Sequence, residues 1–92
     1  MRIILTERFQ RDVGALSADQ RATLLEVLLT LPSAIGNPHN HSGLGIRKLH
    51  PSGIWEARLG LGLRMVFAFG DGALTLARVG THDDIRRYLR SI

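Results

Sequence analysis

Residues 54–79 read IWEARLGLGLRMVFAFGDGALTLARV, and this stretch decides the fold of the 92-residue chain. Its apolar residues fall in three runs, at 54–59, 63–69 and 73–79, and each of the two short separators contains two glycines. Turns of this length join antiparallel strands in hairpins. Because no helical pattern lies between the runs, the sequence predicts an antiparallel meander rather than a parallel sheet with crossover helices.

The chain before residue 46 has a different periodicity. Residues 2–5 resemble a short first strand, and Thr6 then stands where a helix N-cap belongs. The residues that follow it at helical spacing, and that we expect to face the core, are Phe9, Val13 and Leu16. The sequence therefore predicts a strand followed directly by a helix.

Ser17 and Gln20 have the spacing of a capping box, which predicts the start of a second helix and thus a two-helix hairpin. We expect Pro32 to stop this helix and residues 33–45 to form a loop. Residues 46–49 precede another turn and add a possible fourth strand to the meander. The side chains that line one side of the second helix are Leu24, Val27, Leu28 and Leu31.

The last part of the chain, RVGTHDDIRRY at 78–88, leaves a strand for a helix. Thr81 and Asp84 have the form of a capping box, and we expect a short final helix to run through Leu89. The predicted fold class is therefore α+β, with a single domain over residues 1–92. It consists of a short first strand, a two-helix hairpin, a meander of three to four strands and a short C-terminal helix.

Composition narrows the class of protein. The chain has no cysteine, which excludes disulfides and thiolate zinc sites and favours a reducing cytoplasm. No apolar run is long enough for a signal segment or a membrane span. The net charge is +4, and residues 47–92 carry all of the excess, with eight Lys or Arg against four acids. Eleven of the twelve basic residues are Arg, which suits phosphate binding, although a GC-rich genome would also favour arginine over lysine.

Arg58 and Arg64 carry the most specific charge signal. A hairpin that is symmetric about Leu61 places them directly opposite each other, where like charges repel. Such a pair either shares an anion such as a phosphate, or one of its members lies in water at the sheet edge. A register shift by one residue would also separate them. Glu56 lies on the same side of its strand as Arg58 and is either its ion-pair partner or a base, with the ion pair favoured.

Three other motifs carry less information. The echo of GLGIR at 43–47 and GLGLR at 60–64 lacks the full dinucleotide-binding spacing. His39 and His41 have neither a thiolate nor a nearby carboxylate to complete a metal site, so we predict no metal and no cofactor. Trp55 alternates with Ala57 and Leu59, which favours a core position over stacking on a base.

Several segments together resemble one family. These are FQRDVGAL in the first helix, IRKL leading into GIWEARL, LRMVFAF, and RVGTHDDIRRY at the end. In this order they resemble the RelE/ParE superfamily of bacterial toxins from type II toxin-antitoxin systems, over nearly the whole chain. The strand with Arg64 and the Gly-Thr-His ending are most similar to the YafQ-like ribonuclease branch. The resemblance implies metal-independent cleavage of mRNA on the ribosome, with functional residues on the concave face of the sheet and at its C-terminal end.

The resemblance also implies roles for individual residues. Arg64 matches a phosphate-gripping arginine, Arg58 a basic or polar residue one strand earlier, and His82 a position held by Arg or His. Tyr88 falls where some members keep a tyrosine near the cleaved phosphate, and His41 resembles a loop residue proposed as a base. The chain departs from the RelE branch because Glu56 and Arg58 stand where that branch has a lysine pair. This departure favours a histidine-centred mechanism.

The chemistry is consistent with this assignment. RNA carries its own nucleophile, since removing a proton from the 2′-hydroxyl lets it attack the adjacent phosphate while an acid protonates the leaving 5′-oxygen. Arginines then stabilise the charge on the phosphate oxygens. One acid, one base and one or two arginines are sufficient. The other basic residues that we expect to bind RNA are Arg47, Lys48, Arg78, Arg86 and Arg87.

Two alternatives to the ribonuclease remain at this point: a ParE-like inhibitor of DNA gyrase, and a non-catalytic nucleic-acid-binding relative of the same fold. The presence of His82 with Tyr88 favours the ribonuclease. An apolar content of 45% also predicts a protein partner, because the adjacent leucines of the second helix cannot all face one core. The leucines in question are Leu24, Leu25, Leu28 and Leu29. We expect a helical segment of a protein antitoxin to cover this surface and to neutralise the basic sheet.

Overall fold

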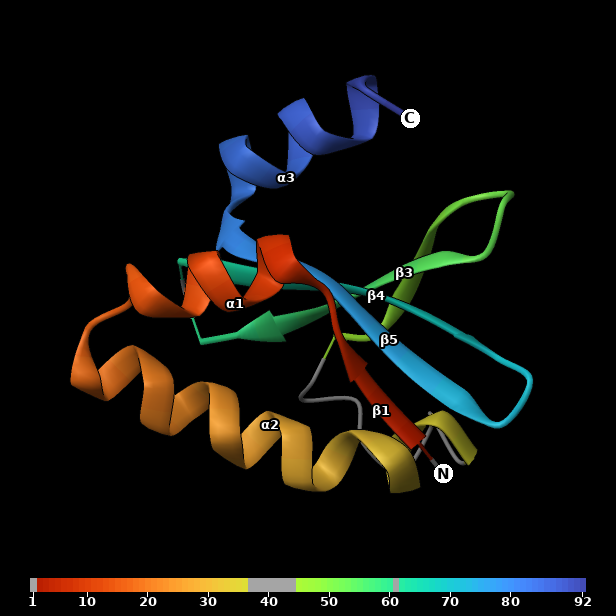
Figure 1. Ribbon diagram of the computed structural model, residues 1–92, viewed down its shortest axis with the longest axis horizontal. Helices are drawn as coiled ribbons and strands as arrows, with labels where there is room; N and C mark the ends of the chain where they lie inside the picture. Colours follow the sequence, from red (N-terminus) through yellow and green to blue (C-terminus); the bar gives the residue numbers. More distant parts are fainter. Residues whose placement is uncertain (1, 37–44, 61) are drawn as a thin grey trace.

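The computed structural model describes residues 2–36, 45–60 and 62–92 and has an α+β architecture (Figure 1). The predicted order of elements is confirmed. The elements are β1 (Arg2–Leu5), α1 (Glu7–Gly14), α2 (Ala18–Gly36), β2 (Arg47–His50), β3 (Ile54–Leu59), β4 (Leu63–Gly70), β5 (Ala73–Thr81) and α3 (His82–Arg90).

All five strands belong to one sheet in the order β1-β5-β4-β3-β2. The strands β2 to β5 form the predicted antiparallel meander, and β1 adds to its edge parallel to β5. Thr6, the N-cap of α1, fixes this edge because its hydroxyl donates to the carbonyl oxygens of Leu76 and Ala77, at 3.0 and 3.1 Å. Parallel pairing of the two ends of the chain leaves no local signal, and the sequence did not predict it.

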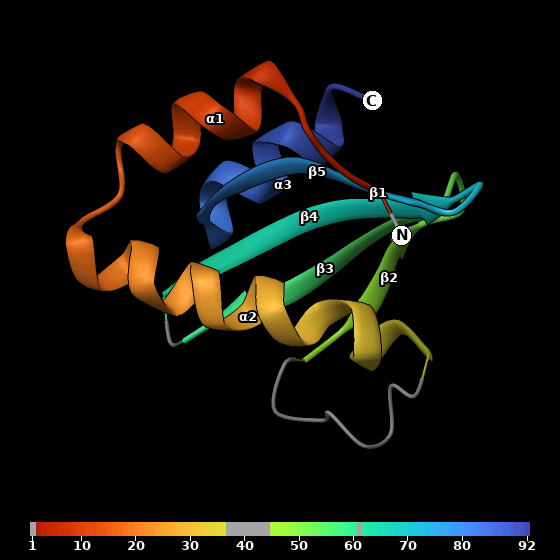
Figure 2. The same cartoon turned by 60° about the horizontal axis from the view of Figure 1, so that its bottom comes forward.

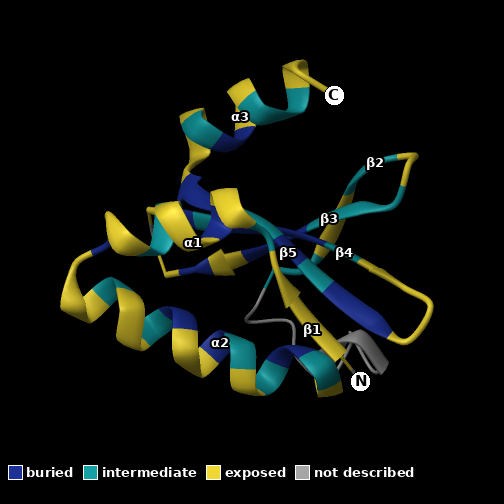
Figure 3. Ribbon diagram, in the orientation of Figure 1, coloured by how far each residue is buried: buried dark blue, intermediate teal, exposed yellow. Residues whose placement is uncertain are grey.

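The two faces of the sheet carry different layers (Figure 2). Helix α2 lies across one face, where it packs against β3. Helix α3 lies on the other face and contacts β4 and β5. Figure 3 shows the buried residues concentrated along the central strands and the inner side of α2. The fully buried side chains of the main core include Leu31, Met65, Phe67, Leu74 and Leu76.

A β-bulge in β5 determines which side chains reach the α3 face. Val66 pairs with Arg78 but the next residue, Phe67, pairs with Leu76, so Ala77 is the extra residue. Without it, Leu76 and Arg78 would point to the same side of the sheet, because side chains alternate along a strand. The bulge lets Leu76 enter the core while Arg78 faces α3.

Two predicted boundaries were wrong. Helix α2 does not stop at Pro32 but continues to Gly36. Proline removes one backbone donor from a helix, and packing can offset this loss. Leu31, which is fully buried, and Leu28, which packs on the core, hold the turn before Pro32 in place. The residues 33–36 that we expected in the loop are therefore helical, and residues 37–44 lie outside the described part of the chain.

Strand β2 covers Arg47–His50 rather than 46–49, because its pairing with β3 shifts between Lys48 and His50. The other strands agree with the prediction to within two residues at each end. Trp55 packs against the main core, as predicted. Within the described ranges, no helix combines the length and apolar character needed to cross a membrane.

Candidate functional site

Arg58 and Arg64 face each other across the β3–β4 hairpin, as predicted from its symmetry. Residues that pair directly across antiparallel strands point to the same face of the sheet. Here this is the face opposite α2, because the neighbouring Ala57 and Met65 point into the main core. The Arg58 residue is exposed, while the Arg64 side chain is 23% exposed. Two arginine side chains thus leave the sheet on the same face from directly opposed positions.

Glu56 lies next to these arginines and is buried, with 4% of its surface exposed. One oxygen, Oε1, accepts a hydrogen bond from Nε of Arg47 at 2.7 Å and lies 3.9 Å from Nε of Arg64. The predicted ion pair between Glu56 and Arg58 was wrong. Arg47 takes that role because it pairs directly with Glu56 across β2 and β3. Arg58 stands two residues along the same strand, roughly 7 Å away by strand geometry.

These residues line a cavity of about 370 Å³, which we call the arginine groove. It is formed by Gly45, Ile46, Arg47, Glu56, Arg58 and Arg64. Gly45 has a positive φ of 57°, and a Cβ at this position would collide with the guanidinium of Arg58. The positive φ favours glycine here, and any larger residue would displace the exposed side chain of Arg58 from the position it occupies. The groove contains three arginines and one carboxylate, so its charge favours an anionic ligand.

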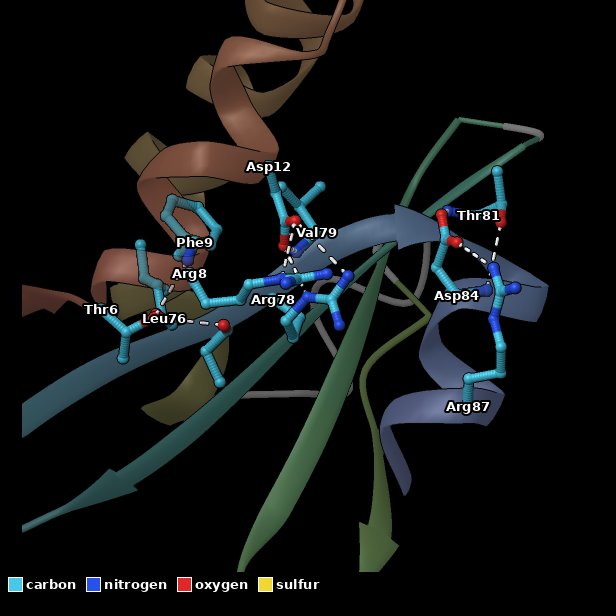
Figure 4. Close-up of polar contacts among 11 residues, drawn as sticks. Thr6, Arg8, Phe9, Asp12, Leu76, Arg78, Val79, Thr81, Asp84 and Arg87 are labelled. Carbon is cyan, nitrogen blue, oxygen red and sulfur yellow. Dashed lines mark hydrogen bonds and ion pairs between the residues drawn. The ribbon is translucent and has the colours of Figure 1, made fainter. Parts of the chain in front are cut away.

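The start of α3 has the predicted capping box (Figure 4). The backbone amide of Asp84 donates to the Thr81 hydroxyl at 3.2 Å, and the Asp84 carboxylate accepts from the amide of Thr81 at 3.0 Å. The Thr81 backbone amide is the main cause that lowers the pKa of Asp84, followed by the Thr81 side chain; the Arg87 guanidinium, 2.6 Å away, adds to the effect. The box fixes where α3 begins.

His82 is the first residue of α3 and is exposed. It follows β5 directly, one residue after Thr81, which pairs with Leu63 next to Arg64. The register therefore brings the start of α3 to the end of the β3–β4 hairpin that carries the opposed arginines. His82 is not among the residues that line the arginine groove.

A second polar cluster joins α1 to β5, and no local pattern predicted it. The carboxylate of Asp12 accepts from Nε of Arg78 at 2.7 Å and from the backbone amide of Val79 at 3.0 Å (Figure 4). The pairing of β1 with β5 ends before Val79, so no β1 carbonyl is available to the Val79 amide. The Asp12 carboxylate accepts that hydrogen bond instead. Arg78 is 13% exposed in its side chain and lies over the ring of Tyr88, 5.9 Å from the centroid. The cluster ties α1, β5 and α3 together.

Tyr88 lies in a different cavity from Arg64. This cavity, which we call the tyrosine groove, has a volume of about 570 Å³ and lies between α1, β5 and α3. Its arginines are paired with carboxylates: Arg78 and, more distantly, Arg8 with Asp12, and Arg87 with Asp84. The described residues that line it are Thr6, Arg8, Ala77, Arg78, Asp84, Arg87, Tyr88 and Ser91. The structure therefore separates Tyr88 from the arginine pair that the sequence analysis placed it with.

The remaining predicted residues are dispersed. Lys48 is exposed and pairs with Trp55, which packs on the core, so it belongs to the α2 side of the sheet rather than to the arginine groove. Arg86 is exposed and 3.9 Å from Asp83 on α3. His41, the other predicted base, lies outside the described residues. Of the six predicted catalytic residues, the arginine groove brings together Glu56, Arg58 and Arg64.

Comparison with known proteins identifies the fold of the chain. No family model and no curated protein matches the chain. Among solved structures, YafQ from E. coli strain BL21(DE3) superposes with a TM-score of 0.71 at 22% identity, covering 92% of this chain and 98% of that one. YafQ in the E. coli DinJ-YafQ toxin-antitoxin complex gives a TM-score of 0.70 at 21% identity, covering 90% and 93%. The RelB-RelE antitoxin-toxin complex from Methanococcus jannaschii gives 0.66 at 15% identity, covering 92% and 96%. The chain therefore has the fold of the RelE and YafQ toxins.

Proposed function

We propose that this chain is the toxin of a type II toxin-antitoxin system and a metal-independent endoribonuclease that cleaves mRNA on the ribosome in the cytoplasm. The observation that carries the proposal is the directly opposed pair Arg58 and Arg64 in the arginine groove. A phosphate that binds between them relieves the repulsion of two like charges. The fold shared with YafQ and RelE supports the same assignment.

The reaction needs no group beyond this chain and the RNA. A base removes the proton of the 2′-hydroxyl, and the 2′-oxygen attacks the adjacent phosphorus. The bond from phosphorus to the 5′-oxygen breaks, which leaves a 2′,3′-cyclic phosphate and a 5′-hydroxyl. In our assignment Arg64 and Arg58 stabilise the charge that grows on the phosphate oxygens, and His82 protonates the leaving oxygen.

The base is either Glu56 or His41. Glu56 lines the groove, but one of its oxygens already accepts from Arg47. Arg47 and Arg86 supply positive charge along the path of the RNA, and Lys48 supplies it on the opposite side of the sheet. Arg78 and Arg87, which are paired with Asp12 and Asp84, hold elements together instead. Tyr88 lies outside the arginine groove and is given no step.

The proposed partner is a protein antitoxin. Leu25 and Leu29 on α2 are 57% and 75% exposed, whereas Leu24 is buried and Leu28 packs on the core. Two large exposed leucines four residues apart form one apolar stripe on the outer side of a helix. We assign this stripe to a helical segment of the antitoxin.

The test is incubation of the purified chain with ribosomes that translate a defined mRNA, followed by mapping of the new 5′ ends. Cleavage at discrete positions that leaves 2′,3′-cyclic phosphate and 5′-hydroxyl ends supports the proposal. Intact mRNA together with inhibition of DNA gyrase would instead identify the protein as a gyrase inhibitor. Intact mRNA with RNA binding alone would identify it as a non-catalytic nucleic-acid-binding protein.

A further inference from the structure

The arginine groove contains an anion of its own. Glu56 is buried, and its Oε1 lies between Nε of Arg47 at 2.7 Å and Nε of Arg64 at 3.9 Å. Within residues 2–36, 45–60 and 62–92, no carboxylate lies within ion-pair distance of Arg58. Glu56 therefore pairs closely with Arg47 and distantly with Arg64, and it leaves Arg58 without an ion pair among the described residues.

This arrangement differs from an ordinary cross-strand ion pair. Arg47 and Glu56 alone would form a neutral pair that leaves no strong charge for a ligand. Here Arg64 approaches the same oxygen from β4 at the limit of ion-pair distance. Glu56 therefore attracts the Arg64 guanidinium but leaves most of its positive charge available to a ligand. Arg58 lies directly opposite Arg64 and adds a further positive charge. The cluster thus carries excess positive charge on this face of the sheet.

We propose that Glu56 is a built-in counter-anion, with which an RNA phosphate competes for the arginines of the groove. The inference rests on the proposed function, in which the groove takes an RNA phosphate. Without a ligand, Glu56 reduces the mutual repulsion of Arg47, Arg58 and Arg64. With a phosphate bound, the same carboxylate repels the ligand and keeps its affinity low, which favours release of the cleaved strand.

Two substitutions break the same ion pair but change the charge of the groove in opposite directions. Glu56→Gln removes the negative charge, so it should bind inorganic phosphate about tenfold more tightly than the original chain. Arg47→Gln removes a positive charge and leaves Glu56 to pair with Arg64, so it should bind phosphate about tenfold more weakly. Dissociation constants come from the rise in melting temperature over a phosphate series at constant ionic strength. A purely structural ion pair would make the two variants behave alike.

Glu26→Gln and Arg21→Gln are the matched controls. Both residues are exposed on α2, and the substitutions change the net charge by the same amounts as the two test variants. Their phosphate affinities should stay within about twofold of the original, since exposed charges at a distance are screened by salt. Shifts of the controls as large as those of the test variants would reduce the effect to net charge and overturn the proposal.

Glu56→Gln has a second expected result. Its melting temperature without phosphate should fall, because three arginines then repel one another, and phosphate should restore more stability to it than to the original chain. If the variant is unfolded without ligand, refolding on addition of phosphate supports the proposal. Unfolding that phosphate does not reverse would contradict it, as would equal phosphate affinities in Glu56→Gln and the original chain.

The outcome for the counter-anion is separate from that for the ribonuclease. Opposite shifts in phosphate affinity without any mRNA cleavage would retain the role of Glu56 and refute the catalytic proposal. Cleavage of mRNA with phosphate affinities that do not respond to Glu56→Gln would retain the ribonuclease and refute the counter-anion. A short single-stranded RNA used in place of phosphate should show the same order of affinities in the three proteins.

Discussion

The arginine groove and the tyrosine groove are both lined by arginines, but they differ in how those charges are compensated. In the tyrosine groove Arg78 is held by Asp12 at 2.7 Å and Arg87 by Asp84 at 2.6 Å. In the arginine groove Glu56 pairs with Arg47 and Arg64, Arg58 has no ion pair among the described residues, and Arg58 and Arg64 occupy directly opposed positions. Arginines with their own carboxylates hold elements together, whereas arginines opposed to one another are placed for a ligand.

His82→Ala should have the largest effect on activity and a small effect on folding. The residue is exposed at the start of α3, so its loss removes little packing. General acid catalysis is worth roughly 10² to 10⁴ in rate, and cleavage of ribosome-bound mRNA should fall by at least the lower figure.

Steady-state and single-turnover cleavage over a range of pH, with thermal unfolding in parallel, measure this prediction. Arg90→Ala, which alters an exposed residue of α3 that has no assigned role in RNA binding, is the matched control and should keep most of the rate. Full cleavage by His82→Ala would remove His82 from the mechanism. The turn before α3 would then have only the structural role of a helix cap, formed by Thr81 and Asp84.

Arg64→Ala should lower the cleavage rate by roughly tenfold to a thousandfold, because it removes a donor whose hydrogen bond strengthens as charge develops on the phosphate. Ribosome binding should change much less, since it depends on dispersed positive charge. Single-turnover rates and binding constants separate the two effects. Lost binding with an unchanged single-turnover rate would make Arg64 a docking residue. The arginine groove would then have no catalytic role that distinguishes it from the tyrosine groove.

Asp12→Ala tests the structural role of the paired arginines in the tyrosine groove. It leaves Arg78, 13% exposed, without its carboxylate and the amide of Val79 without its acceptor. Breaking such a pair on one side should cost about 2–4 kcal/mol in the free energy of unfolding. Chemical denaturation measures this loss. The cleavage rate per folded molecule should change by less than for Arg64→Ala, and a larger fall would show that the Asp12 cluster also belongs to the site.

Thr81→Ala should have the smallest effect, about 1 kcal/mol of stability, through loss of the N-cap hydroxyl of α3. The pKa of Asp84 is lowered in the folded chain, so its contribution is present above the ordinary carboxyl pKa and is lost as pH falls through the lowered value. Because Thr81 contributes to that lowering, the stability gap between the original chain and the variant should narrow below about pH 4. Unfolding curves at neutral and acid pH measure it, and a gap that widened in acid would contradict the assignment.

Local patterns were sufficient for much of the fold and for part of the site. The meander, the N-cap at Thr6 and the capping boxes at Ser17 and Thr81 depend on residues close together in sequence, where turn geometry and backbone hydrogen bonding decide the outcome. In the second helix the amide of Gln20 donates to the Ser17 hydroxyl, and the amide of Ser17 donates to the Gln20 side chain. The opposition of Arg58 and Arg64 followed from the same logic, because the register of a short hairpin is set by its turn. The exposure of Leu25 and Leu29 followed from helical periodicity alone.

The rest was decided by contacts between distant parts of the chain. The bulge at Ala77 lets Leu76 enter the core while Arg78 faces α3, and Asp12 then meets Arg78 across 66 positions of sequence. The parallel pairing of β1 with β5, and the continuation of α2 through Pro32, also depend on packing rather than on local preference. The sequence by itself determined which residues would bear charge and in which elements they would lie. Only the tertiary structure decided which of those charges would be neutralised, since an ion pair depends on the distance between two side chains and not on their separation along the chain.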